Sequence, residues 1–122
     1  MPSKHEKDIG YYEEMTSNKP RILYNVTIKI ANEASEEWLQ WMREYHIPDV
    51  MGTGFFESYQ LNKILNDDPE GLTYAIQYIC PSLLAFQDYQ NIFAKALQKD
   101  HAERFKDKYV AFRTLMEMIE PQ

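Results

Sequence analysis

The sequence predicts an α+β fold in which four strands and two helices follow one another in the order βαββαβ. Three observations carry this prediction. Alternating apolar residues mark the first and last strands, two runs of helical spacing lie between strands, and a polar turn joins two β-rich runs near the middle. With short connections, these elements would form one four-stranded antiparallel sheet with both helices on one face.

The first strand is predicted over residues 22–30, where apolar side chains recur at every second position. A helix is then predicted over 35–46. Ser35 precedes two acids that suit the positive end of a helix, and Trp38 begins a line of bulky residues at helical spacing. We expect this helix to end near its last predicted residue, because Pro48 disfavours helical geometry at the position before it.

The middle of the chain predicts a β-hairpin. Two β-rich runs, 55–65 and 72–80, flank a turn rich in Asp, Asn, Pro and Gly. Ser82 can then cap a second helix, whose apolar line continues to residue 105. The alternation over 109–119 predicts the last strand.

A sheet with both helices on one face leaves its other face uncovered, and so large an apolar surface usually marks an interface. We therefore expect two copies of the chain to pack sheet against sheet as a dimeric α/β barrel. One alternate set of side chains from each strand would line that face. The reverse assignment stays open for the second and third strands, where both alternate sets carry aromatic residues. The expected set is Leu23, Asn25, Thr27, Phe55, Glu57, Tyr59, Ala75, Gln77, Ile79, Ala111, Arg113 and Leu115.

Composition narrows the class of protein. The length and the 44% hydrophobic content fit one domain, predicted over 22–119 behind a flexible polar leader, 1–21. The net charge of −6 with scattered lysines and arginines argues against nucleic acid as a partner. The sequence contains neither a long apolar run nor the spacing of a metal site, and Cys80 stands alone. We expect a cytoplasmic protein without a membrane partner, a metal or a cofactor.

Six segments resemble a family of small bacterial proteins, the domain of unknown function 4286. They are 22–27 (ILYNVT), 36–42 (EEWLQWM), 46–48 (HIP), 73–78 (TYAIQY), 101–105 (HAERF) and 110–115 (VAFRTL). The resemblance covers residues 22–119 and implies the ferredoxin-like, dimeric α/β-barrel superfamily. The family transfers no established activity. The superfamily implies a range that includes cofactor-independent monooxygenases, lactone isomerases and haem-dependent enzymes.

His46 and His101 are the candidates for proton transfer, since histidine titrates near neutral pH without help. Each is predicted near the C-terminal end of its helix, beside the apolar line. We expect the first and third strands to be parallel, so that both helices run the same way and their C-terminal ends share one end of the sheet. The unequal helix lengths would then leave the two histidines about 12 Å apart, unless the second helix bends or overhangs. The simpler interpretation is a pair of structural histidines stabilised by the helix dipoles.

Asn25, Gln77 and Arg113 are the candidate ligand-binding residues, because they would converge on the uncovered face from three strands. Glu57 would join them as the partner of a buried Arg113. The alternative interpretation is a polar network that sets the register of the dimer.

The sequence therefore predicts a homodimer that binds a small, partly apolar molecule or a protein partner between its two sheets. The alternative is a cofactor-independent monooxygenase or isomerase, in which Asn25, Gln77 and Arg113 orient a carbonyl or enolate while His46 or His101 moves a proton. A third, weaker possibility is a haem protein with His101 as the axial ligand. Whether the protein is an enzyme stays open at this point.

Overall fold

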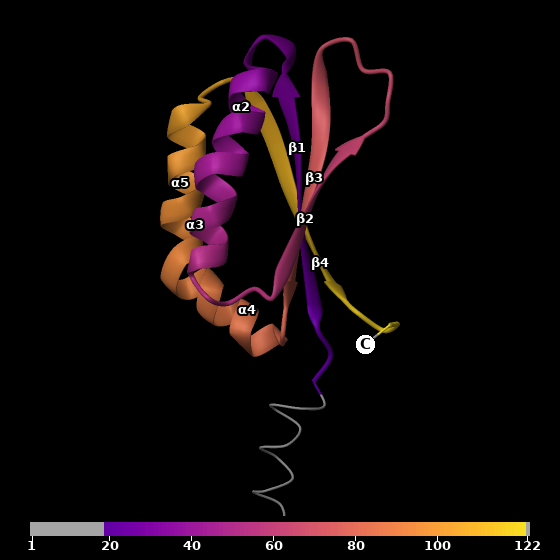
Figure 1. Ribbon diagram of the computed structural model, residues 1–122, viewed down its shortest axis with the longest axis vertical. Coiled ribbons are helices and arrows are strands. Elements are labelled where there is room, and N and C mark those ends of the chain that lie inside the picture. The colour runs from indigo at the N-terminus through magenta and orange to yellow at the C-terminus, as the bar shows by residue number, and fades with distance from the viewer. Residues whose placement is uncertain (1–18, 122) are drawn as a thin grey trace, which may run out of the picture.

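The computed structural model describes residues 19–121 and confirms the predicted βαββαβ order (Figure 1). The sheet has the strand order β2-β3-β1-β4, and every neighbouring pair is antiparallel. Residues 1–18 of the predicted leader lie outside the described part of the chain. The strands are β1 (Ile22–Ala31), β2 (Ser58–Ile64), β3 (Gly71–Cys80) and β4 (Tyr109–Glu117).

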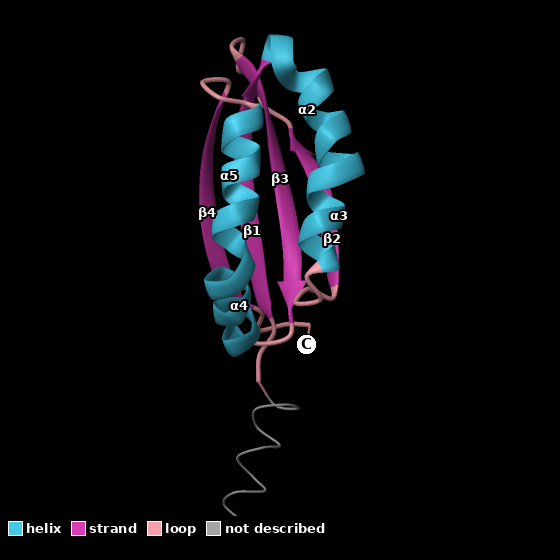
Figure 2. Ribbon diagram, turned by 90° about the vertical axis from the view of Figure 1, so that its left-hand side faces the viewer, coloured by secondary structure: helices cyan, strands magenta, loops and turns pink. Residues whose placement is uncertain are grey.

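Two helical runs cover one face of the sheet, as predicted (Figure 2). Each run contains one turn of π-helix between two α-helical pieces. The first comprises η2 (Asn32–Ala34), α2 (Ser35–Trp41), η3 (Met42–His46) and α3 (Ile47–Gly52). The second comprises α4 (Leu83–Tyr89), η4 (Gln90–Ala94) and α5 (Lys95–Arg104), and the Ser82 hydroxyl caps it by accepting from the Ala85 amide at 3.1 Å.

The predicted end of the first helix was wrong, because the run continues through Pro48 to Gly52. Pro48 stands in the first turn of α3, where its missing N–H interrupts least, and the π turn η3 precedes it. The Ile47 amide donates to the Met42 carbonyl, five residues back, so the wider turn carries the chain past the proline. His46 consequently lies in the middle of the run rather than at its end.

The predicted direction of the helices was also wrong. β1 and β3 are antiparallel neighbours, so the helical runs that follow them are antiparallel as well. Figure 1 shows α2 and the end of α5 at the same end of the molecule, with α3 and α4 at the other. A histidine in the middle of the first run can therefore meet one near the end of the second.

The core lies between the sheet and the helices. Its fully buried members come from both layers: Ile30 and Ile76 from the sheet, Trp38, Met42 and Ile47 from the first run. Burial of these apolar side chains holds the two layers together, because each large side chain contributes about 1.5–3 kcal/mol to the stability of the fold when it is buried. Around Tyr24 the packing is aromatic, with ring centroids of Phe86, Tyr78 and Phe56 at 4.8, 6.0 and 6.2 Å.

The register shows which face each strand presents. In β1 and β3 the alternate residues point to the faces that were predicted, and Asn25 lies opposite Gln77 on the uncovered face. β2 and β4 are reversed: Tyr59 pairs with the helix-facing Tyr78, and Arg113 pairs with the helix-facing Val26. A shift of one residue moves every side chain of a strand to the other face, and both alternate sets of these two strands carry large apolar residues.

Candidate functional site

A small cavity lies between the sheet and the two helical runs, close to the middle of the molecule. It has a volume of about 30 Å³, enough for about two water molecules. Its walls are apolar side chains of the core, and its polar groups come from six elements. Those polar groups are Tyr24 and Tyr78 from the sheet, His46 from η3, Gln98 and His101 from α5, Arg113 from β4, and Tyr89 from α4.

His46 and His101 meet at this cavity, with ring centroids 5.7 Å apart. The separation of about 12 Å expected from the sequence was therefore wrong, because it assumed parallel helices and a first helix that ended at His46. The Trp38 indole donates to His101 Nε2 at 2.9 Å. Since Nε2 accepts this hydrogen bond, neutral His101 carries its proton on Nδ1.

Aromatic rings enclose the two imidazoles. The Trp41 ring stacks on His46 with centroids 5.1 Å apart, and it lies 5.8 Å from His101. The Tyr109 ring meets His101 edge-on at 4.4 Å. His101 is 5% exposed, so the imidazole sits in a largely apolar shell. This shell excludes most of the water that would stabilise an imidazolium.

Both histidines are neutral at physiological pH. Burial lowers the pKa of His46 to about 4, with Arg113 adding to the shift and Asp49 and Asp100 opposing it. Burial likewise lowers the pKa of His101 to about 4, reinforced by the nearby His46 and Arg113. Neutral imidazoles can accept a proton from a bound molecule, and they place no charge of their own beside the cavity.

Arg113 is the exposed member of the cavity wall, and Gln98 beside it is half-buried. Both interact with the Tyr24 phenol, and these contacts favour its ionised form, although burial outweighs them and raises the pKa of Tyr24. Among the described residues that line the wall, the guanidinium is the only cation. The solvent side of the cavity is thus formed by two long, flexible polar side chains.

The predicted ligand-binding residues do not form one site. Arg113 lies on the helix side with the histidines, whereas Asn25 and Gln77 lie on the uncovered face. Asn25 Nδ2 donates to Thr27 Oγ1 at 2.8 Å, and Gln77 borders an open hollow of about 400 Å³ on that face. Glu57 precedes β2 and accepts from Arg21 Nε at 2.8 Å, so the expected Glu57–Arg113 pair was wrong.

Tyr24 and Gln98 are members of the site that the sequence pattern did not indicate. Tyr24 stands in the buried alternate set of the first strand, where its hydroxyl is the one polar group. Gln98 stands three residues before His101 and so shares its helix face. A polar group within an apolar line was therefore the available signal in each case.

Other chemistry finds little support. Among residues 19–121, no group of three or more His, Cys, Asp or Glu side chains is arranged to hold a metal ion. Cys80 is buried, its thiol contacts the Phe55 carbonyl at 3.2 Å, and burial raises its pKa, which makes it a poor nucleophile. No helix in the described part of the chain is both long enough and apolar enough to cross a membrane.

Solved structures with low sequence identity share the fold. A dimeric ferredoxin-like protein from an uncultured marine organism superposes with a TM-score of 0.64 at 9% identity, covering 85% of this chain and 100% of its own. An EthD-like protein from Ralstonia eutropha JMP134 gives 0.63 at 15% identity, with 85% and 96% covered. SnoaB, a cofactor-independent oxygenase from Streptomyces nogalater, gives 0.57 at 11% identity, with 84% and 99% covered.

These likenesses establish the ferredoxin-like architecture, and they carry no activity over to this chain. No curated protein matches the sequence. Residues 21–119, nearly the whole of the described chain, match the sequence pattern of a family described as a domain of unknown function. The chain therefore belongs to the DUF4286 family.

Proposed function

We propose that the protein is a homodimer in which each protomer binds a small, partly apolar molecule with an acidic hydroxyl or a carbonyl group at the His46–His101 cavity. The observation that carries this proposal is the meeting of two neutral imidazoles, 5.7 Å apart, beside the Arg113 guanidinium. An apolar enclosure with a few converging polar groups is the usual construction of a small-molecule site. This site replaces the one expected between the two sheets.

The uncovered sheet face supports the dimer. Phe112 and Val110 on β4 are 64% and 66% exposed, and Met116 on the same face is 40% exposed. Leu23 and Ile79 continue this apolar surface across β1 and β3. A contiguous apolar face of this kind is costly to leave in water, and a second copy would cover it. The dimeric ferredoxin-like protein of the same fold supports this arrangement.

The size of the cavity defines how a ligand would enter. About 30 Å³ accommodates water but no metabolite, so binding requires the rim to open. Arg113 and Gln98 can swing outward without disturbing the core, because one is exposed and the other half-buried. A hydroxyl or enol that enters would face a neutral imidazole as proton acceptor and a guanidinium that stabilises the resulting anion.

This arrangement also favours the second candidate, a cofactor-independent oxygenase or isomerase. Removing a proton from a phenol or enol is the step that His46 or His101 could perform, with Arg113 holding the anion. SnoaB, which has the same fold, is described as a cofactor-independent oxygenase. Binding is the primary proposal, since it needs only the opened cavity and no chemical step, and turnover is its extension.

Native mass spectrometry of protein purified gently from its own host tests the binding proposal. We expect a dimer that carries a constant small excess mass. With 1-naphthol as an added probe, His46→Gln should weaken binding about tenfold or more, and Glu44→Gln, a change at an exposed neighbour, should leave it unchanged. A monomer would overturn the dimer. Naphthol binding that is equal in both variants, with no retained mass, would overturn the site.

Turnover has a separate readout. Oxygen uptake with 1,4-naphthalenediol should exceed the rate in buffer and should fall in His46→Gln if the site is catalytic. Binding of 1-naphthol without any uptake above the buffer rate would leave a binding protein and would reject the oxygenase.

A further inference from the structure

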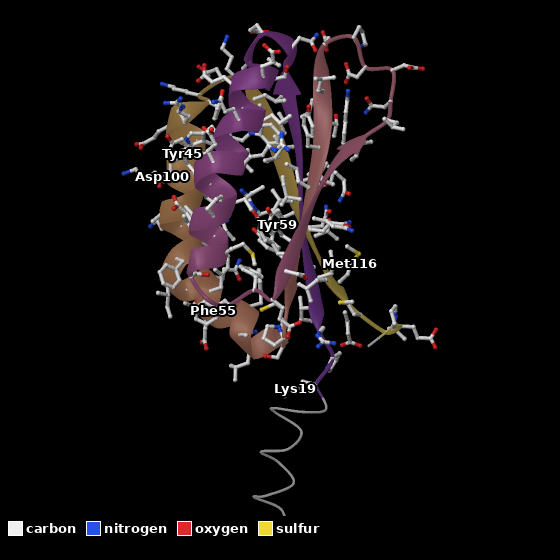
Figure 3. All side chains as sticks on the ribbon, in the orientation of Figure 1. Lys19, Tyr45, Phe55, Tyr59, Asp100 and Met116 are labelled. Atoms are coloured by element: carbon white, nitrogen blue, oxygen red, sulfur yellow. The ribbon has the colours of Figure 1, made fainter. Side chains whose placement is uncertain are left out.

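A groove runs between the edge strand β2 and the first helical run, away from the His46–His101 cavity. It has a volume of about 680 Å³, within the range of about 300–1,000 Å³ that small-molecule sites occupy. Leu39 and Ile47 line it from the helical run, and Leu61 lines it from β2. Figure 3 shows Tyr59 between the run and the sheet, where it forms part of the same wall.

The sequence spacing explains why these residues face one another. Leu39, Arg43 and Ile47 follow at steps of four, which keeps them near one line of a helix. On β2, Tyr59, Leu61 and Lys63 are alternate residues on the helix-facing side. Each wall of the groove therefore presents two apolar or aromatic side chains and one cation.

The floor of the groove is apolar and well packed. Tyr74 of β3 is 7% exposed and lies against Trp38 with ring centroids 4.8 Å apart. Ile47 is 1% exposed. A ligand in the groove would thus cover a preformed surface rather than fill a void in the core.

The two cations have no acidic partner in the described part of the chain. None of the ion pairs formed by residues 19–121 includes Arg43 or Lys63. The nearest acid along the same helical run, Glu44, instead accepts from the Gln40 amide at 3.3 Å. In a protein of net charge −6, two unpaired cations that line an apolar groove from opposite walls fit an anion with an apolar body.

We propose that this groove binds a free amphiphilic carboxylate, in which a medium-length alkyl chain or an aromatic ring lies along Leu39, Ile47 and Leu61 and the carboxylate lies between Arg43 and Lys63. The groove opens on the helix side of the sheet, opposite the face expected to form the dimer. The carboxylate site is therefore independent of both the dimer and the histidine cavity.

Sodium decanoate, below its micellar concentration, is the probe. We expect it to bind the full-length protein and to shift backbone NMR signals of the residues along β2 and the first helical run. The double variant Arg43→Gln/Lys63→Gln should raise the Kd about tenfold or more, because each charged contact to the carboxylate is lost. The matched control, Lys95→Gln/Lys106→Gln, removes the same charge at exposed sites outside the groove and should retain the wild-type Kd.

Three results would overturn the proposal. Equal weakening in the two double variants would show only a general attraction of charge. Equal binding of 1-decanol and decanoate would remove the role of the carboxylate. Binding of an acidic peptide along β2, with no decanoate binding, would assign the groove to a protein partner instead.

Discussion

At the scale of single residues, the pair His46–His101 is the most distinctive feature of the molecule. Two buried ionisable groups that lie close together without a partner of opposite charge lower the stability of a protein. Such a pair therefore indicates either a function or a structural contact that requires it. Here the local reason is partial: the Trp38 indole needs the acceptor that His101 supplies. Among residues 19–121, no hydrogen bond of this kind ties His46 to the core, which makes it the better candidate for proton transfer.

The lowered pKa values predict a loss of stability in mild acid. In the folded protein both pKa values are about 4, against about 6.5 when unfolded, so the unfolded chain binds more protons between these limits. The stabilisation is complete above pH 6.5 and is lost as the pH falls toward 4. Between pH 7 and 5 we expect a decrease of about 2 kcal/mol per histidine in the free energy of unfolding, measured by urea denaturation.

His101→Gln provides the control for this measurement. The variant should be less stable at pH 7, because Trp38 loses its imidazole acceptor, but it should lose about 2 kcal/mol less than the wild type between pH 7 and 5. Parallel pH curves for the two proteins would show that His101 is not held neutral in the folded state.

At the scale of the elements, the distance between neighbouring backbones and the register of the strands decide which substitutions the fold tolerates. Gly71 opens β3 opposite Ala31, and a Cβ placed there would lie 2.6 Å from the Ile30 carbonyl oxygen. That atom belongs to the backbone of the central strand and cannot move without shifting the sheet. Gly52, at the end of α3, has nothing within 4 Å of its Cβ position.

Gly71→Ala should therefore lower the free energy of unfolding by about 1–3 kcal/mol, as overpacking does elsewhere. Gly52→Ala should leave it unchanged or raise it by up to about 1 kcal/mol, because alanine favours the helix. Chemical denaturation of both variants makes the comparison. Equal stability of the two would mean that the start of β3 can move away from β1 without cost.

At the scale of the whole molecule, the two faces of the sheet have different roles. One face is closed by the helical runs and contains the histidine cavity, and the other is open and apolar along β4. The reversed register of β4 matters for both, since it moves Arg113 to the closed side and turns Phe112 to the open side. The proposed ligand site and the proposed dimer interface are thus built from alternate residues of one strand.

This separation predicts the behaviour of two matched variants. Phe112→Glu should shift the protein toward monomer, because it places a charge in the interface. Tyr45→Glu, at a 59% exposed aromatic residue on the helical side, should leave the dimer intact. Size-exclusion chromatography with light scattering measures both. A dimer that survives Phe112→Glu would show that the open face is not the interface.

Sequence periodicity alone determined the order of the elements, the antiparallel sheet with both helices on one face, and the inward set of β1; for β3 it favoured the observed set and left the reverse assignment open. It sufficed there because one alternate set was clearly more apolar than the other. It also selected both histidines. It did not predict the faces of β2 and β4, whose two sets are similarly apolar, nor the helical run that continues through Pro48.

Only the tertiary structure decided that the histidines meet and that Arg113 joins them while Asn25 and Gln77 do not. The reason is physical. Local patterns report what each segment buries, but the direction of a helix and the register of an edge strand depend on how segments far apart in the sequence pack against each other.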